Sequence, residues 1–74
     1  MEKRKWLTDA RKEKKLSQKE LAVQTKLAKS YLSAIENGER TPSGYTALRL
    51  AKILDVPMEW FFEDQIEYEK PVKN

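Results

Sequence analysis

The sequence predicts an all-α fold, and three observations support this prediction. Apolar residues recur three or four positions apart in several short segments, which is the spacing that places them on one face of a helix. β-branched residues are few, and apolar and polar residues nowhere alternate with a period of two over a useful length. Residues that cap or break helices stand between the segments. We therefore expect five helices in one small domain.

The first predicted helix covers approximately residues 2 to 14. Its buried edge is expected to contain Trp6, Leu7 and Ala10. The basic residues at its start, Lys3, Arg4 and Lys5, are interpreted as solvated surface, because charge runs at an N-terminus are commonly exposed.

The second predicted helix begins at Gln18. Ser17 and Glu20 have the spacing of a capping box, in which each side chain accepts a hydrogen bond from the backbone of the other residue. Leu21 and Ala22 are expected to point inward. The side chains expected to face water are Gln18, Lys19 and Gln24.

The apolar periodicity stops near residues 25 and 26 and restarts at Leu27. The buried positions of this third helix are expected to be Leu27, either Tyr31 or Leu32, and Ile35. Asn37 and Gly38 predict its end, because both residue types tolerate the left-handed conformation that ends many helices.

Pro42 predicts a loop over residues 40–43, and Ser43 is a candidate N-cap for a fourth helix. The buried face of that helix is expected to contain Ala47, Leu48, Leu50 or Ala51, and Leu54. The sequence Asp55-Val56-Pro57 breaks it. Pro57 suits the first position of a fifth helix that continues from Met58 to about Phe62 or beyond.

Composition excludes several classes of function. A chain of 74 residues has little core in which to house a buried active site, so we expect no enzyme. The absence of Cys and His removes thiolate chemistry and the usual zinc ligands, so no metal and no cofactor are expected. No apolar run is long enough to span a bilayer, which favours a cytoplasmic protein without a membrane partner. A small-molecule ligand is not expected either.

Positive charge is concentrated in the first half of the chain. Residues 1–40 carry 11 Lys and Arg against 6 Asp and Glu, whereas residues 41–74 carry 4 against 6. This distribution suits a surface that faces a polyanion such as DNA, because neutralising phosphates releases counterions. The alternative is that the lysines only keep a small protein soluble.

Residues 17–38, SQKELAVQTKLAKSYLSAIENG, place two short helices about a turn of three or four residues. Together with Thr41-Pro42-Ser43 and the segment from Leu50 to Val56, this pattern resembles the Cro and lambda-repressor type of helix-turn-helix domain, the Xre family. The resemblance covers residues 7–61. It implies a compact five-helix bundle of the lambda-repressor type with the helix-turn-helix at helices 2 and 3, in a domain of residues 1–62. Residues 63–74 form an acidic and aromatic tail that either extends helix 5 or contributes to dimerisation.

The sequence departs from the family pattern at three positions. Lys15 and Lys26 stand where the family usually has Gly, and each costs about 1 kcal/mol more than Gly if its φ is positive. Ala28 replaces the usual Ser or Thr cap of the third helix and has no side-chain acceptor. We therefore expect the start of that helix to be less stable without DNA.

The resemblance implies a role in DNA binding for specific residues. The third helix would enter the major groove, with base contacts from Lys29, Ser30, Ser33 and Ala34. Phosphate contacts are expected from Gln18, Lys26, Tyr31, Asn37, Arg40 and Thr41. Lys29 could instead contact phosphate, Tyr31 could pack against the core, and Gln18 could be an ordinary exposed residue. Arg11 and Glu36 match an ion pair of the family that joins helix 1 to the end of helix 3.

The C-terminal segment has more large apolar residues than one short helix hides. Phe61 is assigned to the core. A self-association patch could contain Trp60, Phe62, Ile66 and Tyr68. Alternatively, these residues fold back on the first helix around Trp6.

These features favour a sequence-specific transcriptional regulator of the phage-repressor kind, which binds a palindromic operator in double-stranded DNA as a homodimer. A controller protein of a restriction-modification operon is equally compatible. An alternative from another class is a protein-interaction module, such as an antitoxin or an anti-repressor, whose aromatic tail binds a partner protein. The sequence distinguishes neither activation from repression nor one operator from another.

Overall fold

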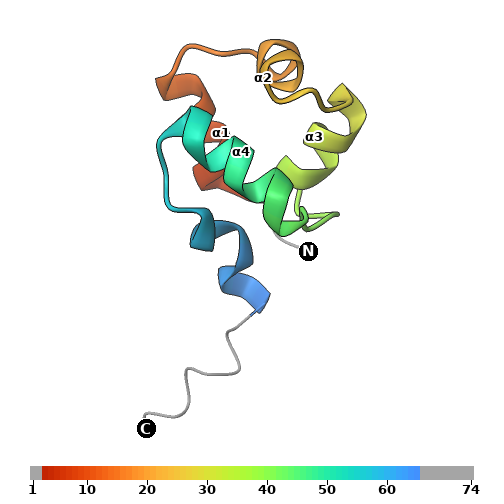
Figure 1. The fold of residues 1–74 in the computed structure, drawn as a ribbon, viewed down its shortest axis with the longest axis vertical. Helices are drawn as coiled ribbons and strands as arrows, with labels where there is room; N and C mark the ends of the chain where they lie inside the picture. Colours follow the sequence, from red (N-terminus) through yellow and green to blue (C-terminus); the bar gives the residue numbers. More distant parts are fainter. Residues whose placement is uncertain (1–2, 66–74) are drawn as a thin grey trace, which may run out of the picture.

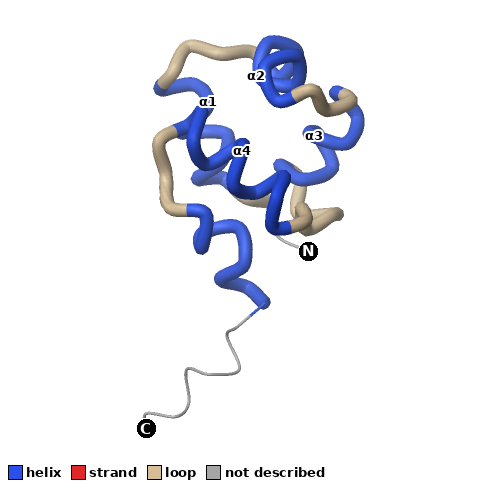
Figure 2. The backbone as a smooth tube through the Cα atoms, in the orientation of Figure 1, coloured by secondary structure: helices blue, strands red, loops and turns tan. Residues whose placement is uncertain are grey.

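The computed structural model describes residues 3–65, and all regular structure in this part of the chain is helical. The elements in chain order are α1 (Lys5–Glu13), α2 (Gln18–Thr25), α3 (Lys29–Glu36), α4 (Gly44–Leu54) and the 3-10 helix η1 (Met58–Gln65) (Figures 1 and 2). The prediction of an all-α fold with five helices is therefore confirmed. In Figure 1, α2 lies at the top, α3 at the right and η1 at the lower end of the bundle.

One hydrophobic core joins all five helices. Its fully buried large apolar side chains are Leu7, Leu21, Leu32, Ile35, Leu50 and Phe61. Burying one Leu, Ile or Phe side chain stabilises a fold by about 1.5–3 kcal/mol relative to leaving it exposed. Every helix contributes at least one of these side chains, so the core fixes the position of α3 relative to the rest of the bundle.

The predicted start of the first helix and one predicted core residue were wrong. α1 begins at Lys5 rather than near residue 2, because the Arg4 backbone N–H donates to the Glu36 carbonyl at 2.8 Å and Arg4 caps the helix. Leu48 is 43% exposed, although we expected it to be buried. The buried face of α4 is set by Ala47, Leu50, Ala51 and Leu54, and Leu48 lies about 100° from Ala47 around the helix.

The local signals that flank α2 are confirmed. The Ser17 hydroxyl accepts a hydrogen bond from the Glu20 N–H at 3.0 Å, and the Glu20 carboxylate accepts one from the Ser17 N–H at 2.8 Å. Lys15 and Lys26 have φ of 60° and 59°, so two lysines adopt the left-handed conformation that favours glycine. The fold therefore retains the family's turn geometry and tolerates the strain.

The last described element, η1, closes the bottom of the core. It begins at Met58, one residue after Pro57, and continues past Phe62 to Gln65 as a 3-10 helix. Phe61 is fully buried, and its ring lies edge-to-face against that of Trp6 with centroids 4.8 Å apart. The assignment of Phe61 to the core is thus confirmed, and η1 belongs to the same folded unit as α1.

Candidate nucleic-acid interface

The turn between α2 and α3 presents the start of α3 to solvent. Lys26 ends α2, two further residues follow, and α3 begins at Lys29. Lys29 and Ser30 are exposed, as is Lys26. The first turn of α3 has no acidic residue and no side-chain cap, so its unpaired backbone N–H groups and the positive end of the helix dipole face outward together with Lys29. This arrangement suits an anion.

Further along α3, the other candidate residues are less accessible. Ser33 and Ala34 are half-buried, so only part of each side chain is available to a ligand. Tyr31 is also half-buried and packs against the core, while Leu32 is the fully buried residue of the pair considered for the core. The exposed Arg40 lies with its guanidinium carbon 5.5 Å from the Tyr31 ring centroid, which is the distance of a cation–π contact. Arg40 thereby adds positive charge beside α3.

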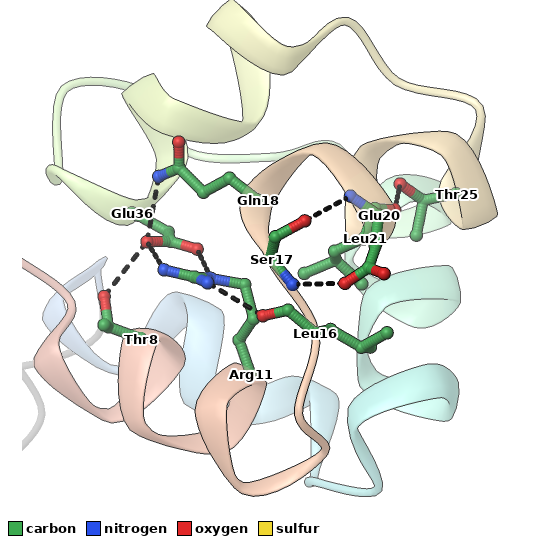
Figure 3. A network of polar contacts seen from close by, with 9 residues as sticks. All are labelled: Thr8, Arg11, Leu16, Ser17, Gln18, Glu20, Leu21, Thr25 and Glu36. Atoms are coloured by element: carbon green, nitrogen blue, oxygen red, sulfur yellow. Dashed lines mark hydrogen bonds and ion pairs between the residues drawn. The ribbon is translucent and has the colours of Figure 1, made fainter.

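A buried carboxylate fixes α3 to the two helices before it (Figure 3). Glu36, at the end of α3, is only 3% exposed. Its oxygens accept hydrogen bonds from Arg11 Nε at 2.7 Å and Thr8 Oγ1 at 3.0 Å. Arg11 also donates to the Leu16 carbonyl at 2.9 Å, just before α2. The ion pair between Arg11 and Glu36 is therefore present, and it belongs to a larger network.

Gln18 is part of this network, so the interpretation of Gln18 as an ordinary exposed residue was wrong. Gln18 is half-buried, and its Nε2 donates to Glu36 Oε1 at 3.1 Å. The first residue of α2 thus holds the last residue of α3. The amide nitrogen carries two hydrogens, so one remains to donate elsewhere while the other is bonded to Glu36.

Arg4 is a buried structural residue, and its interpretation as solvated surface was wrong. Its side chain and backbone together are only 7% exposed. The guanidinium donates to the carbonyls of Ile35 at 2.7 Å, Arg40 at 3.0 Å and Phe61 at 3.3 Å. It also lies within hydrogen-bond distance, 3.4 Å, of the Thr41 hydroxyl. Arg4 consequently joins the N-terminal segment to α3, to the loop after α3 and to η1.

A signal for Arg4 and Thr8 was present in the sequence. Positions 4, 7, 8 and 11 have the spacing of one helix face, and this face contains both the buried Leu7 and the paired Arg11. If polar residues are counted on this buried face as well, Arg4 and Thr8 are predicted to lie beside the core and beside Glu36, the partner of Arg11.

The remaining candidates lie at the end of α3, in the loop after it and in η1. Asn37 is half-buried at the C-cap of α3, and Thr41 is exposed in the following loop. Trp60 packs edge-to-face on Trp6 with centroids 5.4 Å apart, as expected if it folds back on the first helix, yet it remains 39% exposed. Phe62 is half-buried against the core. The candidate dimerisation residues Ile66 and Tyr68 lie outside the described residues.

Within residues 3–65, no group of three or more Asp, Glu, His or Cys side chains is arranged to hold a metal ion. In the same part of the chain, no helix has the length and apolar character needed to cross a membrane. The buried polar side-chain atoms of this region all have hydrogen-bond partners.

Comparisons with known proteins agree with this geometry. A family model described as helix-turn-helix matches residues 7–61. The chain is 38% identical over 61 residues to the uncharacterized HTH-type transcriptional regulator YqaF of Bacillus subtilis (strain 168). The matched residues span 82% of this chain and 80% of YqaF.

Two further proteins are similar. The ImmF control region 10 kDa protein of Bacillus phage phi105 is 40% identical over 52 residues, which span 70% of this chain and 58% of the phage protein. The crystal structure of the restriction-modification controller protein C.AhdI from Aeromonas hydrophila superposes with a TM-score of 0.66 and 38% identity, covering 76% of this chain and 85% of that one.

Proposed function

The chain belongs to the helix-turn-helix family of DNA-binding transcription regulators, of the Cro and lambda-repressor type, and on this premise we propose that it recognises one operator sequence as a homodimer. The observation that carries this proposal is the exposed, uncapped start of α3, where Lys29 and Ser30 stand beside the positive end of the helix dipole. In a helix-turn-helix, this end of the second helix meets base edges in the major groove.

Base recognition is assigned to the exposed side of α3. Lys29 can donate to the O6 and N7 acceptors of guanine, and Ser30 can donate to or accept from a base edge. Ser33 and Ala34, which are half-buried and small, permit close approach and contact with a thymine methyl group. Few long donors reach the groove, so part of the specificity comes from DNA shape.

Phosphate contact is assigned to residues on both sides of α3. Lys26 lies in the turn before it, and Arg40 stands against Tyr31 beside it. Gln18 can donate its second amide hydrogen to a phosphate oxygen while the first braces Glu36, so bracing and binding are compatible. Asn37 and Thr41 complete the proposed set.

Homodimerisation is supported by the small number of base-reading residues in one copy. Two half-sites about one helical turn apart double the base contacts and greatly raise the specificity. Trp60 offers exposed apolar surface on η1 for such an interface, and the half-buried Phe62 lies on the same helix.

The proposal is tested by selecting bound duplexes from a pool of random sequences and measuring the stoichiometry of the complex. We expect the retained sequences to converge on a palindrome that binds two copies of the chain. A partner-binding module without sequence recognition would retain no consensus, and this result would reject the proposal in favour of an antitoxin or anti-repressor.

The genomic position of the selected sequence distinguishes a phage-type regulator from a restriction-modification controller. The similarity to a phage control region protein favours an operator beside phage-derived genes, whereas the similarity to C.AhdI favours one beside restriction and modification genes.

The replacement Lys29→Ala tests base reading. We expect it to weaken binding to the selected duplex by about 1–3 kcal/mol and to relax one operator position, because a base-edge donor is lost. Lys26→Ala, which removes a proposed phosphate contact at an exposed residue, is the comparison variant and should weaken binding to selected and random duplexes by the same factor. Equal losses on both duplexes for Lys29→Ala, measured by fluorescence anisotropy, would defeat its assignment as a base reader.

A further inference from the structure

Arg4 occupies the point where α3, the loop after it and η1 meet. Its guanidinium donates to the carbonyl of Arg40 at 3.0 Å, to that of Ile35 at 2.7 Å and to that of Phe61 at 3.3 Å. These acceptors come from three segments that are far from Arg4 in the sequence. One side chain therefore joins all three segments.

The loop after α3 depends on Arg4 beyond its first residues. The backbone N–H groups of Glu39 and Arg40 both bond the Ala34 carbonyl, at 2.9 and 3.3 Å, so the start of the loop is anchored to α3. The Arg40 carbonyl accepts a hydrogen bond from the Arg4 guanidinium at 3.0 Å. Arg40 itself remains exposed, with its guanidinium against the Tyr31 ring.

We infer that Arg4 is a positioning residue for DNA binding, which holds the loop so that the Arg40 guanidinium is placed for a phosphate. This inference rests on the proposed phosphate role of Arg40. Arg4 acts through Arg40 and not by direct contact, because it is only 7% exposed and its donors are directed at protein acceptors.

The chemistry of the site requires arginine. The guanidinium of Arg4 donates hydrogen bonds to carbonyls of three different segments. It can do so because its several N–H groups lie in one plane and are fixed relative to one another. A lysine would retain the charge but would offer one compact ammonium in place of the fork. Arg4→Lys therefore separates the contribution of geometry from that of charge.

The test is a double-mutant cycle between Arg4→Lys and Arg40→Ala. Affinity for a random-sequence duplex is measured by fluorescence anisotropy at several salt concentrations, at a temperature where circular dichroism shows every variant folded. Random DNA is sufficient because phosphate contacts are independent of sequence. Lys3→Met, which changes an exposed residue next to Arg4, is the control for lost charge in this segment.

We expect Arg4→Lys to weaken binding about fivefold to tenfold, the scale of one ordinary hydrogen bond. The slope of log K against log salt should become shallower by about 0.9, as for one lost phosphate contact, although no charge was removed. Arg40→Ala should weaken the parent similarly but change the Arg4→Lys protein by less than about twofold, because coupled residues are not additive. Lys3→Met should have a much smaller effect.

Two results would overturn the inference while leaving the proposed function intact. One is a folded Arg4→Lys protein that binds as tightly as the parent while Arg40→Ala binds more weakly. The other is an equal effect of Arg40→Ala in both backgrounds. If Arg40→Ala leaves the parent's affinity unchanged, the phosphate role of Arg40 and this inference fail together. Arg4→Gln, which keeps two amide donors, takes the place of Arg4→Lys if that variant does not fold. The same two results overturn the inference, and Lys3→Met then accounts for the charge that Arg4→Gln removes.

Discussion

Replacing Arg11 with Met is expected to destabilise the fold by about 3–5 kcal/mol, because it leaves a buried carboxylate without its charged partner. Glu36 is 3% exposed and would keep only the Thr8 and Gln18 donors, while the Leu16 carbonyl would lose Arg11 as well. A loss of this size is a large part of the stability of a small domain. Urea denaturation followed by circular dichroism measures it.

Two variants control this prediction. Lys5→Met breaks an exposed ion pair with Asp9 in the same helix, whose atoms are 3.6 Å apart, and should cost no more than about 0.5 kcal/mol. The double variant Arg11→Met, Glu36→Leu removes both charges and should be more stable than Arg11→Met alone. A double variant that is less stable than Arg11→Met would show that the unpaired carboxylate is not the cause.

Replacing Phe61 with Ala is expected to destabilise the fold by about 3–5 kcal/mol, because it opens a cavity in a fully buried site. It also removes the edge-to-face contact with Trp6, whose ring centroid is 4.8 Å away. Thermal and urea denaturation should both report the loss, which would establish η1 as a required part of the domain.

Trp60→Ala is the matched comparison, since Trp60 is the neighbouring aromatic residue and contacts the same Trp6 ring at 5.4 Å. Because Trp60 is 39% exposed, its removal should cost about 1 kcal/mol, the scale of one aromatic pair. A variant Phe61→Ala as stable as Trp60→Ala would contradict the placement of η1 against the core.

Features encoded by neighbouring residues could be predicted from the sequence. The capping box of Ser17 and Glu20 uses residues three apart, and the left-handed conformation of Lys15 and Lys26 follows from the family pattern of short turns. The ion pair between Arg11 and Glu36 could be predicted from the family resemblance, because both of its charged side chains match the family pattern. Local chemistry and the family pattern therefore established most of the fold.

Features that depend on distant backbone groups could not be predicted in the same way. The helix spacing of Arg4 with Leu7 and Arg11 indicates a place on the buried face, but it does not indicate the acceptors. Arg4 bonds carbonyls, and because every residue has a carbonyl, these acceptors leave no mark in the sequence. Whether Leu48 is buried depends on which side of α4 the other helices cover.

In the proposed complex with DNA, the start of α3 meets base edges in the major groove. The most direct measurement is a titration of the isotope-labelled protein with the selected duplex, in which amide chemical shifts are followed by NMR. We predict the largest changes over residues 26–34, with a second group around Arg40. If the largest changes fell on α1 and η1 while Lys29 and Ser30 did not move, the claim would be contradicted.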